Sequence, residues 1–326
     1  MKACVDIGGT KVAVCLAPDG QVDDEGRPVL GERLSEPTIK EGAENALSEQ
    51  VLRLLRQACE AEGIGLDDLD AVGVASCGPF LKKDGALAVV NPNICGGLAG
   101  PERGLPNDWT AVPLEQPLRA ALGGDCQLRI ENDCVAALEA ERCWGALQDN
   151  DSCAYLTWST GIGVGLCVDG RVLRGKNGNA GHAGHTFVSD RGGDGALCGC
   201  GNRGDVESLV AGNALARRIG REAEELLAAA VEGEEQAQAE VDELCRVLGR
   251  LIYNLVATLD LEKISLGGAV YWHNRDYLLP RLRQQMDDKF PALVDGFEIA
   301  TAGLGGQVGD YAALALVSER PAACCR

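Results

Sequence analysis

The sequence is short of positive charge and of aromatic side chains. Its 326 residues carry 30 Lys and Arg against 49 Asp and Glu, a net charge of −19, and aromatic residues make up only 4%. A chain of this charge repels nucleic-acid phosphate, and nowhere do more than two Lys or Arg residues follow one another. Binding to nucleic acid is therefore not expected. The acid excess fits a salty or acid-tolerant cytoplasm, and it fits an ordinary solvated surface equally well.

Long apolar runs are also missing. No segment approaches the ~20 apolar residues of a membrane span, and the first ten residues lack the pattern of a signal peptide, so no membrane association and a cytoplasmic location are expected. The 15 cysteines are odd in number and scattered, which favours free thiols in a reducing compartment. The length exceeds the roughly 250–300 residues at which one core stops growing. Two lobes around a cleft are therefore predicted.

Two segments read as strand, glycine turn, strand. Their turns run from Asp6 to Lys11 and from Ser159 to Gly163, and a third glycine pair, Gly267-Gly268, follows a predicted strand and precedes a helix. Glycine lets backbone N–H groups approach phosphate oxygens closely, although a simple hairpin turn explains any one of these segments taken alone. The two similar units predict a duplicated α/β architecture. The three turns together predict a nucleotide site.

The rest of the chain alternates helices with loops. Apolar periodicity predicts helices over 42–61, from 133, over 207–220, 221–231 and 236–260, and after 309. Residues 79–117 are rich in proline and are predicted to be mainly loop, and a loop of this length is usually functional. Glu131-Asn132-Asp133 stands at a strand-to-helix junction, where Asn or Asp caps a helix. One side chain then serves as the cap, and the other carboxylate is available as a general base for a hydroxyl.

The order of these motifs resembles the ROK family of sugar kinases from Ala3 to about residue 318. The resemblance implies an actin-like, ribonuclease-H-like two-lobed ATPase fold of the α/β class, with lobes at 1–122 (joined by a final helix, 308–326) and 123–307. It implies that Asp133 is the catalytic base and that Asn93 and Asn132 contact the sugar. The residues implied to hold ATP and Mg²⁺ are Asp6, Gly8, Gly9, Thr10, Lys11, Thr160, Gly161, Gly267 and Gly268.

The sugar-side motif departs from the hexose kinases of the family, which commonly carry Glu-x-Gly-His. Here it reads His182-Ala183-Gly184-His185-Thr186, which is similar to the bacterial N-acetylmannosamine kinases. Imidazole donates or accepts a hydrogen bond, whereas carboxylate only accepts, so a different group of the sugar is expected opposite His182. The alternative is that His182 is a polar residue without a role in selectivity.

The resemblance also implies a zinc site. His185, Cys198 and Cys200 match the family's ligands, but Asp205 stands where the family has a third cysteine. Zinc accepts an Asp oxygen, so a His-Cys-Cys-Asp set is chemically reasonable, and the alternative is a loop held by packing with two inert thiols. Glu207 matches a glutamate that contacts the sugar together with His182 and His185. Its alternative role is to complement a helix dipole.

The resemblance implies an ATP-dependent kinase acting on the C6 hydroxyl of an N-acylhexosamine, with N-acetylmannosamine first. The alternatives are a glucokinase or a kinase for fructose, mannose or N-acetylglucosamine. A sugar-responsive regulator is a further reading, but such proteins add a helix-turn-helix module, and this chain enters its first phosphate-loop strand at Ala3. A sugar-sensing pseudoenzyme is disfavoured because the base and the turns are intact. A homodimer is implied by the resemblance.

Overall fold

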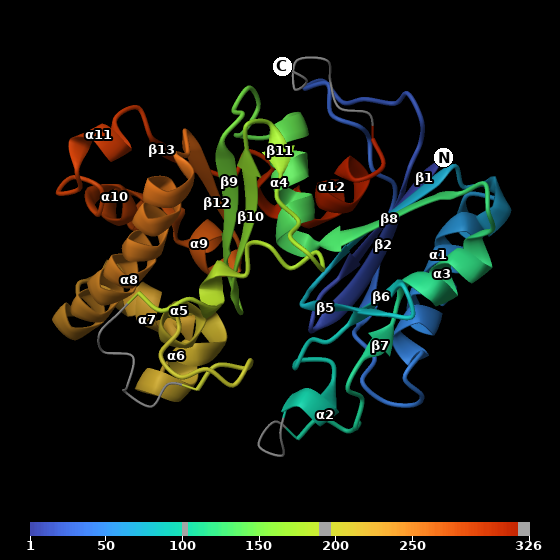
Figure 1. The fold of residues 1–326 in the computed structure, drawn as a ribbon, viewed down its shortest axis with the longest axis horizontal. Helices are drawn as coiled ribbons and strands as arrows, with labels where there is room; N and C mark the ends of the chain where they lie inside the picture. Colours follow the sequence, from blue (N-terminus) through green and yellow to red (C-terminus); the bar gives the residue numbers. More distant parts are fainter. Residues whose placement is uncertain (100–103, 189–196, 319–326) are drawn as a thin grey trace. The chain divides into compact units, whose positions relative to one another are not determined.

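The computed structural model describes residues 1–99, 104–188 and 197–318, and the chain divides into two compact units (Figure 1). Unit 1 holds Met1–Cys143, Arg174–Ala180 and the described residues from Gln307 onward, and unit 2 holds Trp144–Leu173 and Gly181–Gly306. The predicted division after residue 122 differs from this one. The strand and helix that follow residue 122 stay in unit 1 because the strand pairs with the first sheet.

Unit 1 contains a five-stranded sheet, a small three-stranded sheet and five α-helices among its described residues. The order in the larger sheet is β3-β2-β1-β4-β8, and in the smaller one β5-β6-β7. The elements are β1 (Lys2–Ile7), β2 (Lys11–Ala17), β3 (Leu34–Pro37), α1 (Ala46–Ala61), η1 (Leu66–Asp68), β4 (Ala71–Ser76), β5 (Phe80–Lys83), β6 (Ala86–Val89), α2 (Gly96–Ala99), β7 (Val112–Pro113), α3 (Glu115–Leu122), β8 (Gln127–Asn132), α4 (Asp133–Trp144) and α12 (Val308–Ala315).

Helices pack on both faces of the larger sheet in unit 1. Val72 and Val74 of β4 join the apolar core that α1 covers, so the residue between them, Gly73, faces the other way. Helix α12 lies on that second face, where a Cβ on Gly73 would come within 1.9 Å of the carbonyl oxygen of Ala313. Glycine at this position therefore lets α12 lie directly against the sheet. Residues 319–326 of the predicted final helix lie outside the described residues.

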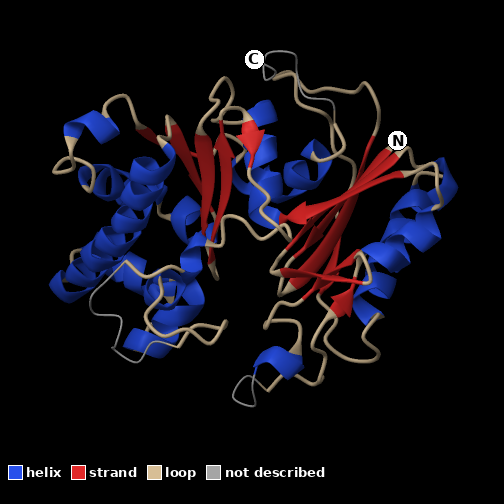
Figure 2. Cartoon of the chain, in the orientation of Figure 1, coloured by secondary structure: helices blue, strands red, loops and turns tan. Residues whose placement is uncertain are grey.

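Unit 2 contains a second five-stranded sheet with its own helices; Figure 2 shows strands in red and helices in blue. Its sheet has the order β11-β10-β9-β12-β13. The elements are β9 (Cys153–Trp158), β10 (Ile162–Val168), β11 (Arg171–Val172), η3 (Ala183–His185), α5 (Val206–Val210), α6 (Gly212–Ile219), α7 (Ala223–Glu232), α8 (Glu235–Leu259), β12 (Lys263–Gly267), α9 (Ala269–His273), α10 (Arg275–Gln284), α11 (Pro291–Val294), β13 (Glu298–Thr301) and η4 (Gly305–Gln307).

The two large sheets share one topology, which confirms the predicted duplication. Each begins with a hairpin, β1-β2 or β9-β10, whose first strand pairs in parallel with a later strand. The predicted loop over 79–117 is only partly right, because β5 and β6 form a hairpin there and pair with β7. Asp84-Gly85 is the turn of this hairpin, and Asp84 adopts a positive φ of 53°.

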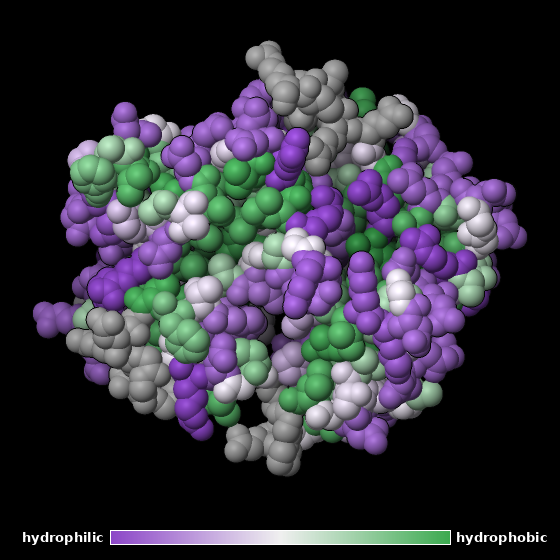
Figure 3. Space-filling model, viewed as in Figure 1, coloured by the Kyte–Doolittle hydropathy of each residue, from purple (hydrophilic) through white to green (hydrophobic). Residues whose placement is uncertain are grey.

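Figure 3 shows hydrophilic residues over much of the visible face, with hydrophobic residues exposed between them. None of the described helices is both long enough and apolar enough to cross a membrane.

Candidate functional site

In unit 1, three parallel strands bring the predicted base and the first glycine turn to one edge of the sheet. The register aligns Ile7 of β1 with Ser76 of β4 and Asn132 of β8. The carboxyl ends of parallel strands meet at one edge, so Asp6, near the end of β1, and Asp133, just after β8, face the same region. The two carboxyl groups also interact electrostatically. Burial is the main cause of the raised pKa of Asp6, and the negative charge of Asp133 raises it further.

The first glycine turn is closed by its own backbone and stands beside the predicted sugar loop. The backbone N–H of Gly8 donates to the carbonyl of Lys11 over 2.8 Å, and the hydroxyl of Thr38 donates to the carbonyl of Gly8 over 2.7 Å. A Cβ on Gly9 would lie 3.1 Å from the Cβ of Asn93. The structure therefore brings Asn93 against the turn. Thr10 is exposed at the tip of the turn.

Asn132 and Asp133 share the capping task that the sequence assigned to one of them. The backbone N–H of Cys134 donates to Oδ1 of Asn132 over 3.0 Å and to Oδ1 of Asp133 over 2.8 Å. Burial raises the pKa of Asp133, and these hydrogen bonds oppose the rise. Burial likewise raises the pKa of Asp6, to about 6, although Arg33 opposes it. Two carboxyl groups with raised pKa values thus stand at one edge of the sheet, an arrangement that is common at acid–base sites.

In unit 2, the second turn is built around Glu207. The backbone N–H of Ile162 donates to Oε2 of Glu207 over 3.0 Å, and a Cβ on Gly161 would lie 2.7 Å from the same oxygen. Gly161 is therefore required for the close approach of this carboxylate. Helix α6 packs on the turn as well, because the N–H of Gly212 donates to the carbonyl of Ser159 over 2.8 Å.

The third glycine turn lies at the same edge of unit 2 as the second. Strand β12 ends at Gly267, which pairs in parallel with Thr157 of β9. Strand β9 leads directly into the turn that contains Thr160, which is exposed. Gly268 adopts a positive φ of 88° and links β12 to α9. Unit 2 thus brings its two predicted nucleotide turns together, and unit 1 holds the first turn with the predicted base.

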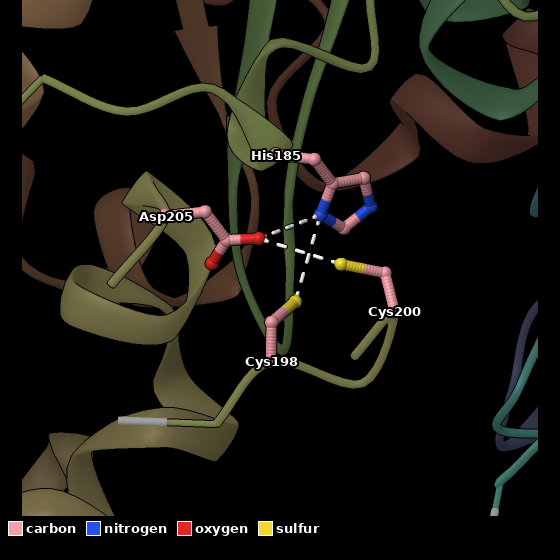
Figure 4. Close-up of side chains that lie close together, drawn as sticks. All are labelled: His185, Cys198, Cys200 and Asp205. Carbon is pink, nitrogen blue, oxygen red and sulfur yellow. Dashed lines mark hydrogen bonds and ion pairs between the residues drawn. The ribbon is translucent and has the colours of Figure 1, made fainter. Parts of the chain in front are cut away.

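The four predicted metal ligands converge, as Figure 4 shows. Nδ1 of His185 lies 3.3 Å from Oδ2 of Asp205 and 3.5 Å from Sγ of Cys198, and Sγ of Cys200 lies 3.5 Å from Oδ2 of Asp205. All four donor atoms lie within 4.8 Å of one another. Asp205 is fully buried and also caps α5, because its Oδ1 accepts from the N–H of Ser208 over 2.9 Å.

This geometry fits a tetrahedral metal ion. Zinc bonds of about 2.0–2.3 Å place neighbouring ligand atoms roughly 3.3–3.8 Å apart, close to the separations found here. Burial opposes ionisation of Asp205, but hydrogen bonds from His185 and Ser208 outweigh it and lower the pKa of Asp205 to about 2. Burial raises the pKa of the Cys198 thiol. A buried ionised carboxylate with two thiols and an imidazole around it suits a divalent cation.

His182 immediately precedes η3 and is half-buried. Burial lowers its pKa, and the neighbouring His185 lowers it further, so the imidazole is neutral at pH 7. Its ring centroid lies 6.1 Å from that of His185. A neutral imidazole offers one donor and one acceptor.

Two arginines of unit 1 contact carboxylates of the predicted motifs, namely Asp6 of the first glycine turn and Glu131 of the Glu-Asn-Asp motif, and sequence reasoning missed both. Arg33 contacts Asp6 and Asp310, and Arg174 contacts Glu131 and Glu139. Neither arginine lies in a glycine motif, and their partners are distant in the sequence. The only local signal was the glutamate of the Glu-Asn-Asp motif, which a basic side chain is expected to neutralise when half-buried.

Comparison with known proteins settles the family. The sequence model of the ROK family matches residues 2–320. The chain belongs to the ROK family. An N-acetylmannosamine kinase of Citrobacter koseri is 35% identical to this ROK protein over 272 residues, 82% of each chain. The ROK hexokinase of Thermus thermophilus is 30% identical, with a TM-score of 0.73 over 97% of both chains. A ROK family glucokinase of Streptomyces griseus, solved with glucose and AMPPNP, is 27% identical, with a TM-score of 0.67 over 96% of this chain and 97% of that one.

Membership in the ROK family confirms the predicted α/β actin-like fold. It also establishes the activity class, an ATP-dependent carbohydrate kinase. The kinases among the relatives favour the kinase over the regulator and pseudoenzyme interpretations. The substrates of the class are a sugar and ATP.

The raised pKa values predict how activity depends on pH. If Asp6 orients hydrated magnesium and Asp133 accepts a proton, both must be ionised, so kcat/KM should rise as the pH increases through about 6. Stability should change in the opposite direction. The folded pKa of Asp6 lies above the ordinary value of about 3.9, so its contribution to the free energy of unfolding is lost as the pH rises from about 4 through about 6.

Rate profiles and urea unfolding between pH 4 and 8 measure both effects. In an Asp6→Asn variant, the free energy of unfolding should lose the part of its pH dependence that comes from Asp6. An acid limb of kcat/KM centred below pH 5 would contradict the assignment.

Proposed function

We propose that this kinase transfers the γ-phosphoryl group of ATP to the C6 hydroxyl of an N-acylhexosamine, with N-acetylmannosamine as the preferred sugar. The observation that carries the proposal is the neutral, half-buried His182 in place of the glutamate common in hexose kinases. The 35% identity to an N-acetylmannosamine kinase supports it. An imidazole N–H can donate to the acyl carbonyl oxygen, which a carboxylate cannot do.

Asp133 is the proposed general base. It stands half-buried at the start of α4, with Oδ1 held by the N–H of Cys134 and a pKa raised toward the working range of a base. Asn132 and Asn93 are the proposed sugar contacts in unit 1. Glu207 is the proposed contact in unit 2, where its oxygens already meet Ile162 and Cys198. Transfer of the phosphoryl group then rests mainly on positioning and charge stabilisation.

The glycine turns are the proposed phosphate contacts. Backbone N–H groups at Gly9, Thr160 and Gly268 present donors without a charged side chain, whereas the N–H of Gly8 closes the turn on the carbonyl of Lys11. Lys11 supplies an exposed positive charge next to the first turn. Bound Mg²⁺ would neutralise charge developing on the phosphates. Asp6 would orient the water molecules around it.

Zinc is the proposed structural metal, with His185, Cys198, Cys200 and Asp205 as its ligands. The ion would tie η3, which directly follows His182, to the start of α5, which carries Glu207. Its contribution is to orient these sugar-side residues and not to enter the reaction. A homodimer in the cytoplasm remains a prediction of the sequence.

A panel of sugars in a coupled ADP-release assay tests the substrate. We expect N-acetylmannosamine to give the highest kcat/KM. A His182→Glu substitution should lower the ratio of kcat/KM for N-acetylmannosamine to that for glucose by about 10-fold or more, because the carboxylate leaves the acyl carbonyl oxygen without a donor. His273→Glu, at the exposed last residue of α9, is the matched control and should leave the ratio unchanged.

Glucose is the second candidate, because a glucokinase of the same family is 27% identical over nearly the whole chain. A preference of the parent chain for glucose over every N-acylhexosamine would reverse the order of the two sugars. An unchanged ratio in the His182→Glu variant would remove His182 from the specificity argument.

A further inference from the structure

Arg33 joins three separate elements of unit 1. It stands one residue before β3, its Nε donates to Oδ1 of Asp310 over 2.6 Å, and its Nη2 donates to Oδ2 of Asp6 over 3.1 Å. Asp310 lies in the first turn of α12, and Asp6 lies near the end of β1. All three side chains are between 21% and 29% exposed, so water screens the contacts only in part. The sequence separations are 27 and 277 residues.

Asp310 is a firm anchor for the arginine. Helix α12 lies directly against the sheet at Gly73, and an added Cβ on Gly309 would come within 3.3 Å of Oδ2 of Asp6. The packing of α12 therefore holds the carboxylate of Asp310 close to β1. A guanidinium presents several N–H donors in one plane, so a single arginine can hold two carboxylates in a fixed relation.

The charges around Asp6 show why it needs such a partner. The groups that act on its carboxylate are Arg33 and Lys11, which favour ionisation, and Asp133 and Asp310, which oppose it. Among the described residues, only Oδ2 of Asp6 accepts a recorded hydrogen bond, and the donor is Arg33. The other oxygen is then available to a water molecule of hydrated magnesium. Without Arg33, a largely buried carboxylate would face two like charges.

We propose that Arg33, anchored by Asp310, is a positioning residue that holds Asp6 in place for the magnesium–ATP complex. This inference rests on the proposed function of Asp6 in the first phosphate turn. It assigns roles to two residues outside every glycine motif. Arg33 acts through Asp6, and Asp133 remains the residue that faces the sugar hydroxyl.

Steady-state kinetics at varied Mg²⁺ and ATP test the proposal, with calorimetric binding of Mg·ADP as a readout that needs no turnover. Arg33→Gln should raise KM for Mg·ATP and the Mg²⁺ concentration for half-maximal rate by about 10–100-fold, the usual cost of losing a partner behind a metal-site residue. The KM for the sugar should stay within about twofold. Binding of Mg·ADP should weaken in parallel with the rise in KM.

Two further variants separate positioning from folding. Arg33→Lys keeps the charge but cannot hold both carboxylates in one plane, so it should recover part of the Mg·ATP affinity. Asp310→Asn is close in shape to the parent side chain and should raise the Mg²⁺ requirement in the same direction by less. The double variant Arg33→Gln/Asp310→Asn should be no worse than Arg33→Gln alone, because Asp310 acts only through the arginine.

Arg53→Gln is the matched control. Arg53 of α1 forms a two-pronged ion pair with Glu36 of β3, the strand that follows Arg33, at 2.8 and 2.6 Å, without contact to the phosphate turn. Its kinetics should equal those of the parent chain.

An Arg33→Gln variant with an unchanged Mg²⁺ requirement, or with an equal rise in the sugar KM, would overturn the proposal. Failure of the proposed substrate would instead appear in the parent chain, as absent turnover of N-acetylmannosamine while Mg·ADP binding persists. The Arg33 experiment then continues with the best sugar of the panel.

Discussion

An Asp133→Asn variant will phosphorylate its sugar about 10²–10⁴-fold more slowly than the parent chain, the range that a positioned general base contributes. The carboxamide keeps the shape of the side chain but cannot accept the hydroxyl proton. The loss should appear in kcat, because the sugar contacts proposed for Asn132 and Asn93 are untouched. Coupled ADP release at saturating sugar and ATP measures it.

The structure explains why this variant should fold. The Oδ1 of an asparagine can still accept from the N–H of Cys134, so the start of α4 stays capped. Burial raises the pKa of Asp133, so removing the charge should not lower the free energy of unfolding at pH 7. Asp84→Asn, in the exposed turn of the β5–β6 hairpin, is the matched control, since asparagine tolerates the positive φ found there.

A rate for Asp133→Asn within about threefold of the parent rate would remove Asp133 from the role of base. Because Asp6 lies at the same edge of the sheet, an Asp6→Asn variant run in parallel distinguishes the two carboxylates. Loss at Asp6 should depend on the Mg²⁺ concentration, whereas loss at Asp133 should not.

Local patterns explain why so much of the fold was predictable. A glycine turn between two short apolar strands is complete within about fifteen residues, and it occurs at Asp6 to Lys11 and again at Ser159 to Gly163. The duplicated sheets follow from these two hairpins. The β5–β6 hairpin was overlooked because prolines dominate 79–117, although Asp84-Gly85 is a strong two-residue turn signal within it.

Contacts between distant segments were not predictable. Nothing in the residues around Arg33 indicates that Asp310, 277 positions later, would meet it, because that contact depends on α12 packing over the first sheet. The boundary between the two units was not predictable for the same reason. Strand β8 joins unit 1 through its pairing with β4, and pairing between distant strands leaves no local signal.

The cluster of His185, Cys198, Cys200 and Asp205 is a third case, because the family resemblance implies four candidate metal ligands but not the second tasks of their side chains. From the sequence, Asp205 is expected only to replace a cysteine of the family. The structure shows that its Oδ1 caps α5 while Oδ2 faces the cluster, which a thiolate cannot do with one atom. Cys198 and Glu207 are likewise in contact, at 3.4 Å, so the cluster touches a proposed sugar residue directly.

Removal of the metal should therefore weaken both the fold and sugar binding. We expect one zinc per chain by atomic absorption. A chelator should lower the melting temperature, because an ion whose free concentration is about 1,000 times its dissociation constant stabilises the folded state by about 4 kcal/mol. Cys198→Ser should lose the zinc and raise the sugar KM at least tenfold. Cys126→Ser, a half-buried cysteine outside the cluster, should change neither quantity.

Asp205 allows the metal to be separated from the helix cap. Asp205→Asn keeps an oxygen acceptor for the N–H of Ser208 but offers zinc a neutral amide, so the zinc content should fall while the capping energy of about 1 kcal/mol is retained. Asp205→Ala removes both functions and should be less stable than Asp205→Asn when both are free of metal. If Asp205→Asn instead binds zinc as the parent chain does, the carboxylate serves only the helix, and the metal is held by His185, Cys198 and Cys200.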